Sequence, residues 1–574
     1  MRTMFGFLRR PQETAAATPT AAAQMRFTTD AHLQQRGGAG WYTPEMNLLA
    51  QKWQWYAGQQ YDDLQFSWSG ARLRHVGSGV LTKALVPRSD GVPPGFRSMG
   101  APDRSECRPS APLRTVPRVI NRFTALLFGE DCAPVVRCVG NEARGHWLNS
   151  FVRTTHLWAR MQYARAVGGS MGAVAIGIEV VEGEPRVEVY APSRCKPVWK
   201  DRQRYVLKAL EIRDQVSTWV RVKGGEREEQ RYWVRRVISE EGDVKYKPVW
   251  CGDHPTSETE DGVLVVGNKG GEPEWEALVD LDASVRHDLG FCPVVWIKNL
   301  DLNEGPYGVE DCAGLYEQAR DLDEQRASIS RFIKGNLDPT LTVTSETGKL
   351  PQELRVGYGA GIGLKTGTRA EYLQANLSAA TVAAEWFETS QDLFFKEADC
   401  LELTTAAGPA QTAFEVRQKL GPQQSKTALL REQYGQQGVR RLLLLAVKLE
   451  LTLRAQGLGM TAMEPRVVKV EAGEDQTEVV SIGEGNGYID VSWPPIARPT
   501  PADTTAAVTS ATTALQGGVI DEETAVRYAA GYFQAEDPAE VLSRIRAERE
   551  EREAREEREA REAAEVEPPP EFTA

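Results

Sequence analysis

One segment of the sequence, Gly168–Gly172 (GGSMG), matches the pattern that presents a nucleophilic serine. In serine hydrolases this G-x-S-x-G pattern follows a strand and precedes a helix, which holds the hydroxyl on a strained turn beside an amide oxyanion hole. His254 or His287 could supply the base of such a site. Here the order is reversed, because apolar residues at helical spacing precede Ser170 and a β-branched run, Ala173–Val180, follows it. The segment therefore favours a helix-to-strand turn of small residues.

A second segment, Gly357–Thr366 (GYGAGIGLKT), has the glycines and the lysine of a phosphate-binding loop. In such a loop the glycines let backbone amides approach a phosphate, and the lysine neutralises its charge. The loop needs Gly-Lys-Thr contiguous at the start of a helix, whereas Leu364 separates Gly363 from Lys365. The spacing favours a strand. A serine hydrolase or an NTPase that uses one of these two segments remains the alternative function.

Metal-binding and redox chemistry have little support in the sequence. The six histidines are dispersed, and His146 and His156 are not spaced as i and i+4. The eight cysteines are scattered without a CxxC pair, which is typical of reduced and mostly buried thiols. We therefore expect no metal, no cofactor and no catalytic residue, and we predict that the chain is not an enzyme.

The composition describes a large protein that does not grip nucleic acid. The chain has 574 residues, 41% of them hydrophobic, which is enough for several domains. Its formal net charge is −12, so it lacks the basic surface of a protein that neutralises many phosphates. The most apolar run, Leu442–Leu453, is interrupted by Lys448 and Glu450 and is too short to span a bilayer. We expect no membrane segment.

The chain divides into a β-rich part and a helical part. Alternating or β-branched runs between Val187 and Ile297 predict strands. After Gly305-Pro306 the apolar spacing changes and predicts a long helix that ends near Gly335. Two strands, Thr340–Thr344 and Ile362–Thr366, are predicted to follow it. The positions that share the helical spacing are Cys312, Leu315, Ala319, Leu322, Arg326, Ile329 and Ile333.

The helical pattern then resumes. A second helix is predicted from Ala379 to about Leu401, and Thr404–Gln411 (TTAAGPAQ) has the residues of a loop. A third helix is predicted to reach about Leu453, with Pro422 near its start, where a proline should kink or break it. Strand character returns between Val467 and Trp493.

Three further helices are predicted near the C-terminal end, at Ala502–Leu515, Asp521–Tyr532 and Pro538–Glu565. Asp521 is suited to cap the second of these helices, and Pro538 to occupy the first position of the third.

This order of elements resembles the portal, or head-to-tail connector, proteins of tailed bacteriophages. The run Asn303–Asn336 (NEGPYGVEDCAGLYEQARDLDEQRASISRFIKGN) looks like the family's first stem helix. The segment Leu515–Glu551 (LQGGVIDEETAVRYAAGYFQAEDPAEVLSRIRAEREE) is similar to its C-terminal pattern. That pattern has a helix, a glycine turn, an I-S/D-x-E-T-A helix start and a D-P-x-x-E-x-x-R-I-x-x-E helix. The resemblance covers most of Trp41–Glu565.

The resemblance implies an α+β portal fold with an α/β wing, a helical stem, a small β-containing clip and a helical C-terminal crown, assembled as a ring. Its parts are expected at residues 1–40 (disordered N-terminal arm), 41–304 (wing), 305–335 (first stem helix), 336–378 (clip), 379–402 (second stem helix), 403–411 (tunnel loop), 412–500 (kinked wing helix and wing strands), 501–566 (crown) and 567–574 (disordered tail).

The same resemblance implies a channel at one capsid vertex through which double-stranded DNA is packaged and ejected. The expected partners are further copies of the chain, twelve in the virion, double-stranded DNA in any sequence, the terminase large subunit, the major capsid or scaffolding protein, and a head-completion or tail adaptor protein. The protein would be assembled in the host cytoplasm and reside in the virion.

The resemblance also suggests which residues meet these partners. Candidates that face DNA are Thr404, Thr405, Ala406, Ala407, Gly408 and Gln411 in the tunnel loop, with Lys334 and Lys419. Candidates for the clip surface that binds terminase or the adaptor are Lys349, Glu353, Arg355, Lys365 and Arg369.

Overall fold

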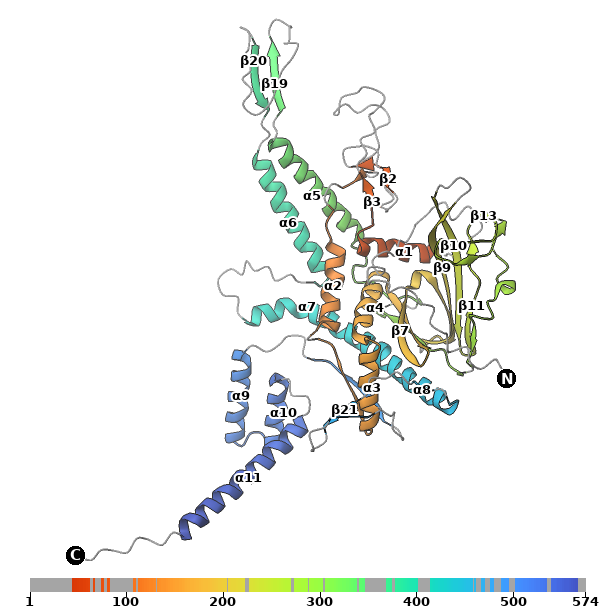
Figure 1. Cartoon of the computed structure of the whole chain (residues 1–574). Coiled ribbons are helices and arrows are strands. Elements are labelled where there is room, and N and C mark those ends of the chain that lie inside the picture. The colour runs from red at the N-terminus through yellow and green to blue at the C-terminus, as the bar shows by residue number, and fades with distance from the viewer. Residues whose placement is uncertain are drawn as a thin grey trace, which may run out of the picture. The chain divides into compact units, whose positions relative to one another are not determined.

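The computed structural model (Figure 1) describes residues 44–61, 66–67, 74–76, 80–82, 107–109, 112–130, 132–203, 205–221, 227–269, 273–287, 289–302, 305–337, 340–345, 368–373, 377–400, 413–457, 459–460, 466–469, 475–478, 487–494, 501–533 and 538–565. The chain divides into two compact units. The first comprises residues 1–130 and 136–491, and the second comprises residues 131–135 and 492–574. The predicted arm, tunnel loop and tail, and the predicted strand Ile362–Thr366, lie outside the described residues.

Four helices form the helical part of the body in the first unit. They are α1 (Pro44–Ala57), α2 (Thr115–Phe128), α3 (Glu142–Thr154) and α4 (Leu157–Met171). On α2 the buried residues Val119, Ile120, Phe123 and Leu127 recur at helical spacing, so one apolar stripe faces the core. The other three helices of this group all contact α4, which is buried along most of its second half.

Two antiparallel sheets form the β-rich part that the sequence predicts. The smaller has the order β18-β6-β7, with β6 (Ala173–Val181) between β18 (Val294–Lys298) and β7 (Glu184–Tyr190). Because β6 is covered by neighbours and contacts both α4 and another helix, α8, it reads as an almost continuous apolar run. The larger sheet has the order β17-β11-β10-β9-β8, and β12 also pairs with β10.

The bounds of the larger sheet's strands are β8 Cys195–Asp201, β9 Val206–Arg221, β10 Arg227–Ser239, β11 Gly242–Lys245, β12 Val249–Trp250 and β17 Val285–Arg286. Short pairs join β1 (Phe66–Ser67) to β4 (Cys107–Arg108), β2 (Arg74–Val76) to β3 (Val80–Thr82), β13 (Asp253–His254) to β16 (Asn268–Lys269), β14 (Ser257–Glu258) to β15 (Leu264–Val265), β21 (Arg466–Lys469) to β22 (Asp475–Glu478), and β5 (Val135–Val139) to β23 (Tyr488–Ser492). Two short 3₁₀ turns lie at η4 (Pro192–Arg194) and η5 (Trp275–Leu278).

A helical hairpin with a β-hairpin at its tip extends from this body. It consists of α5 (Tyr316–Leu337), β19 (Thr340–Ser345), β20 (Thr368–Leu373) and α6 (Leu377–Glu397). The two helices lie side by side, and the two strands pair where α5 ends and α6 begins (Figure 1). The first strand agrees with the prediction, while the second described strand, β20, follows the segment that was predicted.

The expectation that a helix occupies 305–335 is wrong at its start, because α5 begins only at Tyr316. The amides of Gly308 and Asp311 donate to the carbonyls of Gly172 and Gly169, so they bond to the end of α4 rather than within a helix. Gly314 then adopts a positive φ of 76°, which a helix interior does not allow.

The long helix after residue 412 is continuous. It comprises α7 (Ala413–Glu432), the π-helical segment η6 (Gln433–Arg440) and α8 (Arg441–Ala455). The helix runs through Pro422 without a break, and the regular α-helical pattern changes at η6 instead. A π-helical segment widens the turn and is often found at functional positions.

The second unit contains the three helices predicted for the C-terminal region, α9 (Pro501–Gln516), α10 (Glu522–Phe533) and α11 (Pro538–Glu565). The predicted cap is confirmed, since Oδ1 of Asp521 accepts the amide of Thr524 at 3.0 Å. Arg549 of α11 also pairs with Glu522 of α10 at 2.6 Å. Within the described residues of the whole chain, every helix is too short or too polar to span a membrane.

Candidate functional site: the helical hairpin and its base

The serine of the GGSMG segment is buried near the end of α4. The Ser170 hydroxyl donates to the carbonyl of Val167 at 2.9 Å, and its side chain is inaccessible to solvent. Gly172 ends the helix with a φ of +84°, and β6 follows. The predicted order of helix before strand is confirmed, so the hydroxyl is not presented on a strand-to-helix turn.

The glycines of this segment are explained by close packing. A Cβ atom on Gly168 would collide with the Tyr434 hydroxyl of η6. A Cβ atom on Gly169 would collide with the guanidinium of Arg165 and the carboxylate of Asp311. Small residues are therefore required because polar side chains from distant parts of the chain meet the end of α4 here.

That meeting point is a buried polar network at the base of the hairpin. Nη2 of Arg165 donates to Oδ2 of Asp311 at 2.7 Å, and both side chains are fully buried. Asn299 donates to the other Asp311 oxygen at 3.0 Å and accepts the Tyr434 hydroxyl at 3.1 Å. Burial alone would lower the pKa of Arg165, but Asp311 and Tyr434 together outweigh this effect and hold the pKa above its ordinary value. The network joins α4, the segment before α5, and η6.

The apolar side chains of the hairpin differ in their exposure to solvent. Near the base, Leu322 of α5 and Phe394 of α6 are buried, in keeping with a helix pair packed on the body. On another face of α6, a line of large apolar side chains is exposed. Its members are Val382 (65% exposed), Trp386 (64%) and Leu393 (48%), spaced as i, i+4 and i+11. We call these three residues the stem stripe, because they lie on one face of the helix.

Comparison with solved structures finds similar chains, one of which is described here. The chain is similar to a chain of the virion of a native gene transfer agent particle. The TM-score is 0.25 and the identity 12%, and the match covers 60% of this chain and 85% of that chain. No family model matches the sequence, and no curated protein matches it.

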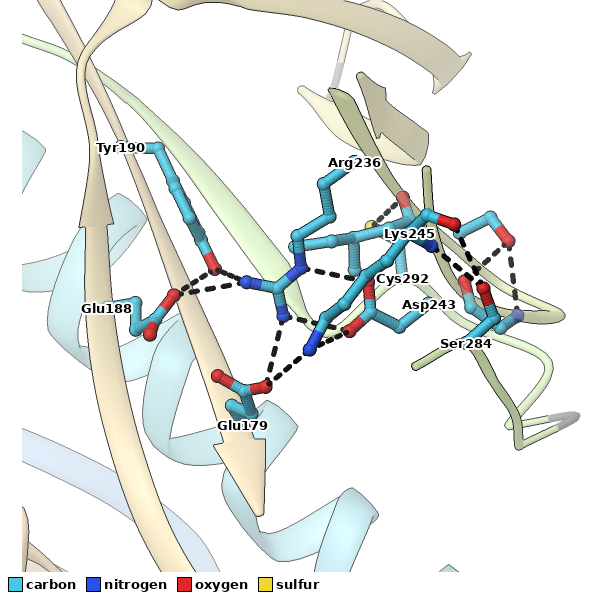
Figure 2. A network of polar contacts seen from close by, with 11 residues as sticks. Glu179, Glu188, Tyr190, Arg236, Asp243, Lys245, Ser284 and Cys292 are labelled. Carbon is cyan, nitrogen blue, oxygen red and sulfur yellow. Dashed lines mark hydrogen bonds and ion pairs between the residues drawn. The ribbon is translucent and has the colours of Figure 1, made fainter. Parts of the chain in front are cut away.

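A second polar network lies in the body, beside a cavity of about 300 Å³ between the two sheets and α8. Figure 2 shows Arg236 of β10 at its centre, surrounded by side chains of β6, β7 and β11. The guanidinium makes two hydrogen bonds to the Asp243 carboxylate, at 2.8 and 2.9 Å. It also donates to Glu179 at 3.2 Å and to Glu188 at 3.3 Å.

This network joins strands of the two sheets. Arg236 binds carboxylates from three other strands, and the Lys245 ammonium lies 3.8 Å from both Glu179 and Asp243. Burial raises the pKa of Glu179, and the nearby Arg236 offsets part of that effect. The paired charges therefore fasten the smaller sheet to the larger one.

Glu179→Gln should change how stability depends on pH. A carboxyl whose pKa is higher in the folded than in the unfolded protein adds stability that is fully present below the unfolded pKa and is lost as pH rises through the folded pKa. As pH falls from 7 towards the ordinary value of 4.5, the wild type should gain stability relative to the variant. Urea unfolding of both proteins across this range measures the difference, and parallel curves would contradict the assignment.

Most of the site residues suggested by the sequence cannot be placed. The tunnel-loop candidates Thr404, Thr405, Ala406, Ala407, Gly408 and Gln411, and the clip candidates Lys349, Glu353, Arg355 and Lys365, lie outside the described residues, as does the Gly357–Thr366 segment. Lys334, Arg369 and Lys419 belong to α5, β20 and α7, and their side chains are not described. Their roles stay predictions.

Two other expectations concern metals and thiols. Within the described ranges no group of histidine, cysteine and acidic side chains is arranged to hold a metal ion. The described cysteines are free thiols, and four of them are buried: Cys195, Cys292, Cys312 and Cys400.

The sequence analysis missed the buried network at the hairpin base. Arg165 stands in a run of small and apolar residues, which is an unusual place for an arginine and the one signal that could have found it. Its partner Asp311 falls in the segment 305–335 that was expected to be a helix, so the sequence offered no reason to place it beside Arg165.

Proposed function

We propose that this chain is a portal subunit, one of a ring of copies that encloses a channel for double-stranded DNA at one vertex of a capsid. The observation that carries the proposal is the exposed stem stripe on a helical hairpin. It is supported by the order of the described elements, in which helix, β-hairpin, helix and long helix follow an α/β body, and by the sequence resemblance of Asn303–Asn336 and Leu515–Glu551.

The stem stripe supports contact with another copy of the chain. Three large apolar side chains in a row on one helix are costly to leave in water, and each gains about 1.5–3 kcal/mol when buried. On α5, Ile333 is also exposed, by 47%. If one side of the hairpin packs on a different side of its neighbour, the contact is heterologous, and such contacts close into rings when the rotation allows it.

The charge of the chain suits passage of DNA rather than tight binding. A protein that neutralises many phosphates binds with strong dependence on salt, whereas a moving polymer requires weak and repeated contacts. The net charge of −12 favours the second behaviour. In this proposal the terminase supplies the motor activity and docks on the clip formed by β19 and β20 and the residues between them. The capsid or scaffolding protein and the adaptor are the other partners.

The segment 404–411 offers a direct test of the channel. It contains no charged residue, and the proposal places it in the channel as the tunnel loop. Thr405→Lys would add a ring of phosphate contacts, so we expect it to reduce the DNA packaged per capsid by about tenfold, whereas Thr405→Ser should package normally. Rings of both variants should look alike by electron microscopy. Equal filling by the lysine and serine variants would remove this segment from the channel.

A further inference from the structure

A single buried lysine lies where the hairpin meets the long helix. Lys426 belongs to α7 and is only 9% exposed. Its Nζ donates to the carbonyl of Asp311 at 3.0 Å and to the carbonyl of Ala398 at 2.9 Å. The same nitrogen lies 4.8 Å from the ring centre of Phe123 on α2. One side chain of α7 thus contacts three other parts of the chain: the segment before α5, the end of α6, and α2.

The two carbonyls belong to the two ends of the hairpin. Asp311 precedes α5, which begins at Tyr316, and Ala398 follows directly after the last residue of α6, Glu397. The carbonyl end of a helix carries partial negative charge, so a cation at Ala398 is favourably placed. The two bonds hold the start and the end of the hairpin on the same ammonium.

The Asp311 side of this contact is fixed independently of Lys426. The Asp311 carboxylate is held by Arg165 and Asn299, and its amide donates to the Gly169 carbonyl at 2.9 Å. On the other side, the Ala398 amide continues the helical pattern by donating to the Phe394 carbonyl at 3.0 Å. Lys426 therefore ties the end of α6 to a residue, Asp311, that other buried partners also hold.

We propose that Lys426 is the positioning residue that fastens the end of α6 to α7 and so fixes the point at which the segment 401–412 leaves α6. The functional part of this inference rests on the proposed function, in which that segment faces the DNA in the channel. Force applied to the segment by moving DNA would then pass to the body through one buried ammonium, instead of bending α6 away from α7.

Two native thiols report on this junction. Cys312 follows Asp311, Cys400 lies just beyond Ala398, and both are buried. Burial raises the pKa of the Cys312 thiol, and Cys400 is among the neighbouring groups that raise it further. Because only an accessible thiolate reacts quickly with a maleimide, the labelling rate of each cysteine measures how often the junction opens.

The first experiment compares wild-type protein, Lys426→Met and the control Lys396→Met, whose lysine is exposed in the last turn of α6. Maleimide labelling of the full chain is followed by mass spectrometry at Cys312 and Cys400 separately. Methionine keeps the length of the side chain but donates no hydrogen bond, so Lys426→Met should label at Cys400 about tenfold faster, with the control at the wild-type rate. An unchanged rate at Cys400 in Lys426→Met would overturn the inference.

The second experiment measures DNA packaged per capsid for the same three proteins. We expect Lys426→Met to form rings but to package less than half as much DNA as the control. Faster labelling with normal packaging would overturn the force-bearing role of Lys426. If wild-type rings themselves package no DNA, the proposed function fails, while the labelling result still decides whether Lys426 fastens the junction.

Discussion

Arg165→Met is expected to lower the free energy of unfolding by about 3–5 kcal/mol, because it leaves the buried carboxylate of Asp311 without its cation. Both side chains of this pair are fully buried, and their closest polar atoms are 2.7 Å apart. Methionine fills a similar volume, so the cost comes from the unpaired charge more than from a cavity. Asn299 would still donate to Asp311, but one neutral hydrogen bond does not replace a guanidinium.

Chemical unfolding at one fixed protein concentration measures this loss. The matched control is Arg186→Met, which removes an ion pair to Glu184 whose two side chains are more than half exposed, and it should cost at most about 1 kcal/mol. The double variant Arg165→Met/Asp311→Leu should recover most of the loss, because it removes the buried charge together with its partner. Equal costs for the two arginine variants would contradict the stabilising role assigned to the buried pair of Arg165 and Asp311.

Trp386→Glu should prevent ring assembly while leaving the subunit folded. The side chain is the largest of the stem stripe and is 64% exposed in the single chain, so its substitution costs the subunit little. In a ring, each copy of this indole would lose on the order of 3 kcal/mol of burial, and each interface would gain a charge that has no partner. The loss recurs at every interface of a closed ring.

Light scattering and electron microscopy of the purified proteins test this expectation. The control is Thr381→Glu, which adds the same charge at an exposed position of α6 that lies off the stem stripe. The control should assemble like the wild type, and circular dichroism should show equal helix content in all three. Normal rings from Trp386→Glu would mean that the stem stripe is not an interface between copies.

The helices with clear periodicity could be predicted from the sequence, and those set by distant contacts could not. The spacing of Leu322 and Ile329 predicts α5, because local pattern and burial agree there. The same pattern also extends back through Leu315 to Cys312, but these residues precede the helix. Just before them, the amides of Gly308 and Asp311 bond to the end of α4, and no local pattern reports a contact between residues so far apart in the chain.

The candidate site was harder to predict than the fold for a related reason. Sequence reasoning selects residues by type, and it selected lysines and threonines as candidates for contact with DNA. Arg165 and Lys426 instead bind buried partners from segments that are distant in the sequence. Residue type alone therefore does not separate them from the many exposed lysines and arginines. The unbroken helix at Pro422 also depends on a distant contact. Proline lacks the backbone amide that a helix interior uses, but this helix packs against α2 and tolerates the loss.

The hairpin of α5 and α6 also constrains how such a chain can evolve. Its two helices leave and re-enter the body at one junction, so a residue gained by one helix displaces the tip unless the other gains the same number. Seven residues make about two turns and lengthen a helix by about 10 Å while keeping its outward face aligned. Descendants with longer or shorter hairpins should therefore differ by paired insertions of this size, with the body unchanged.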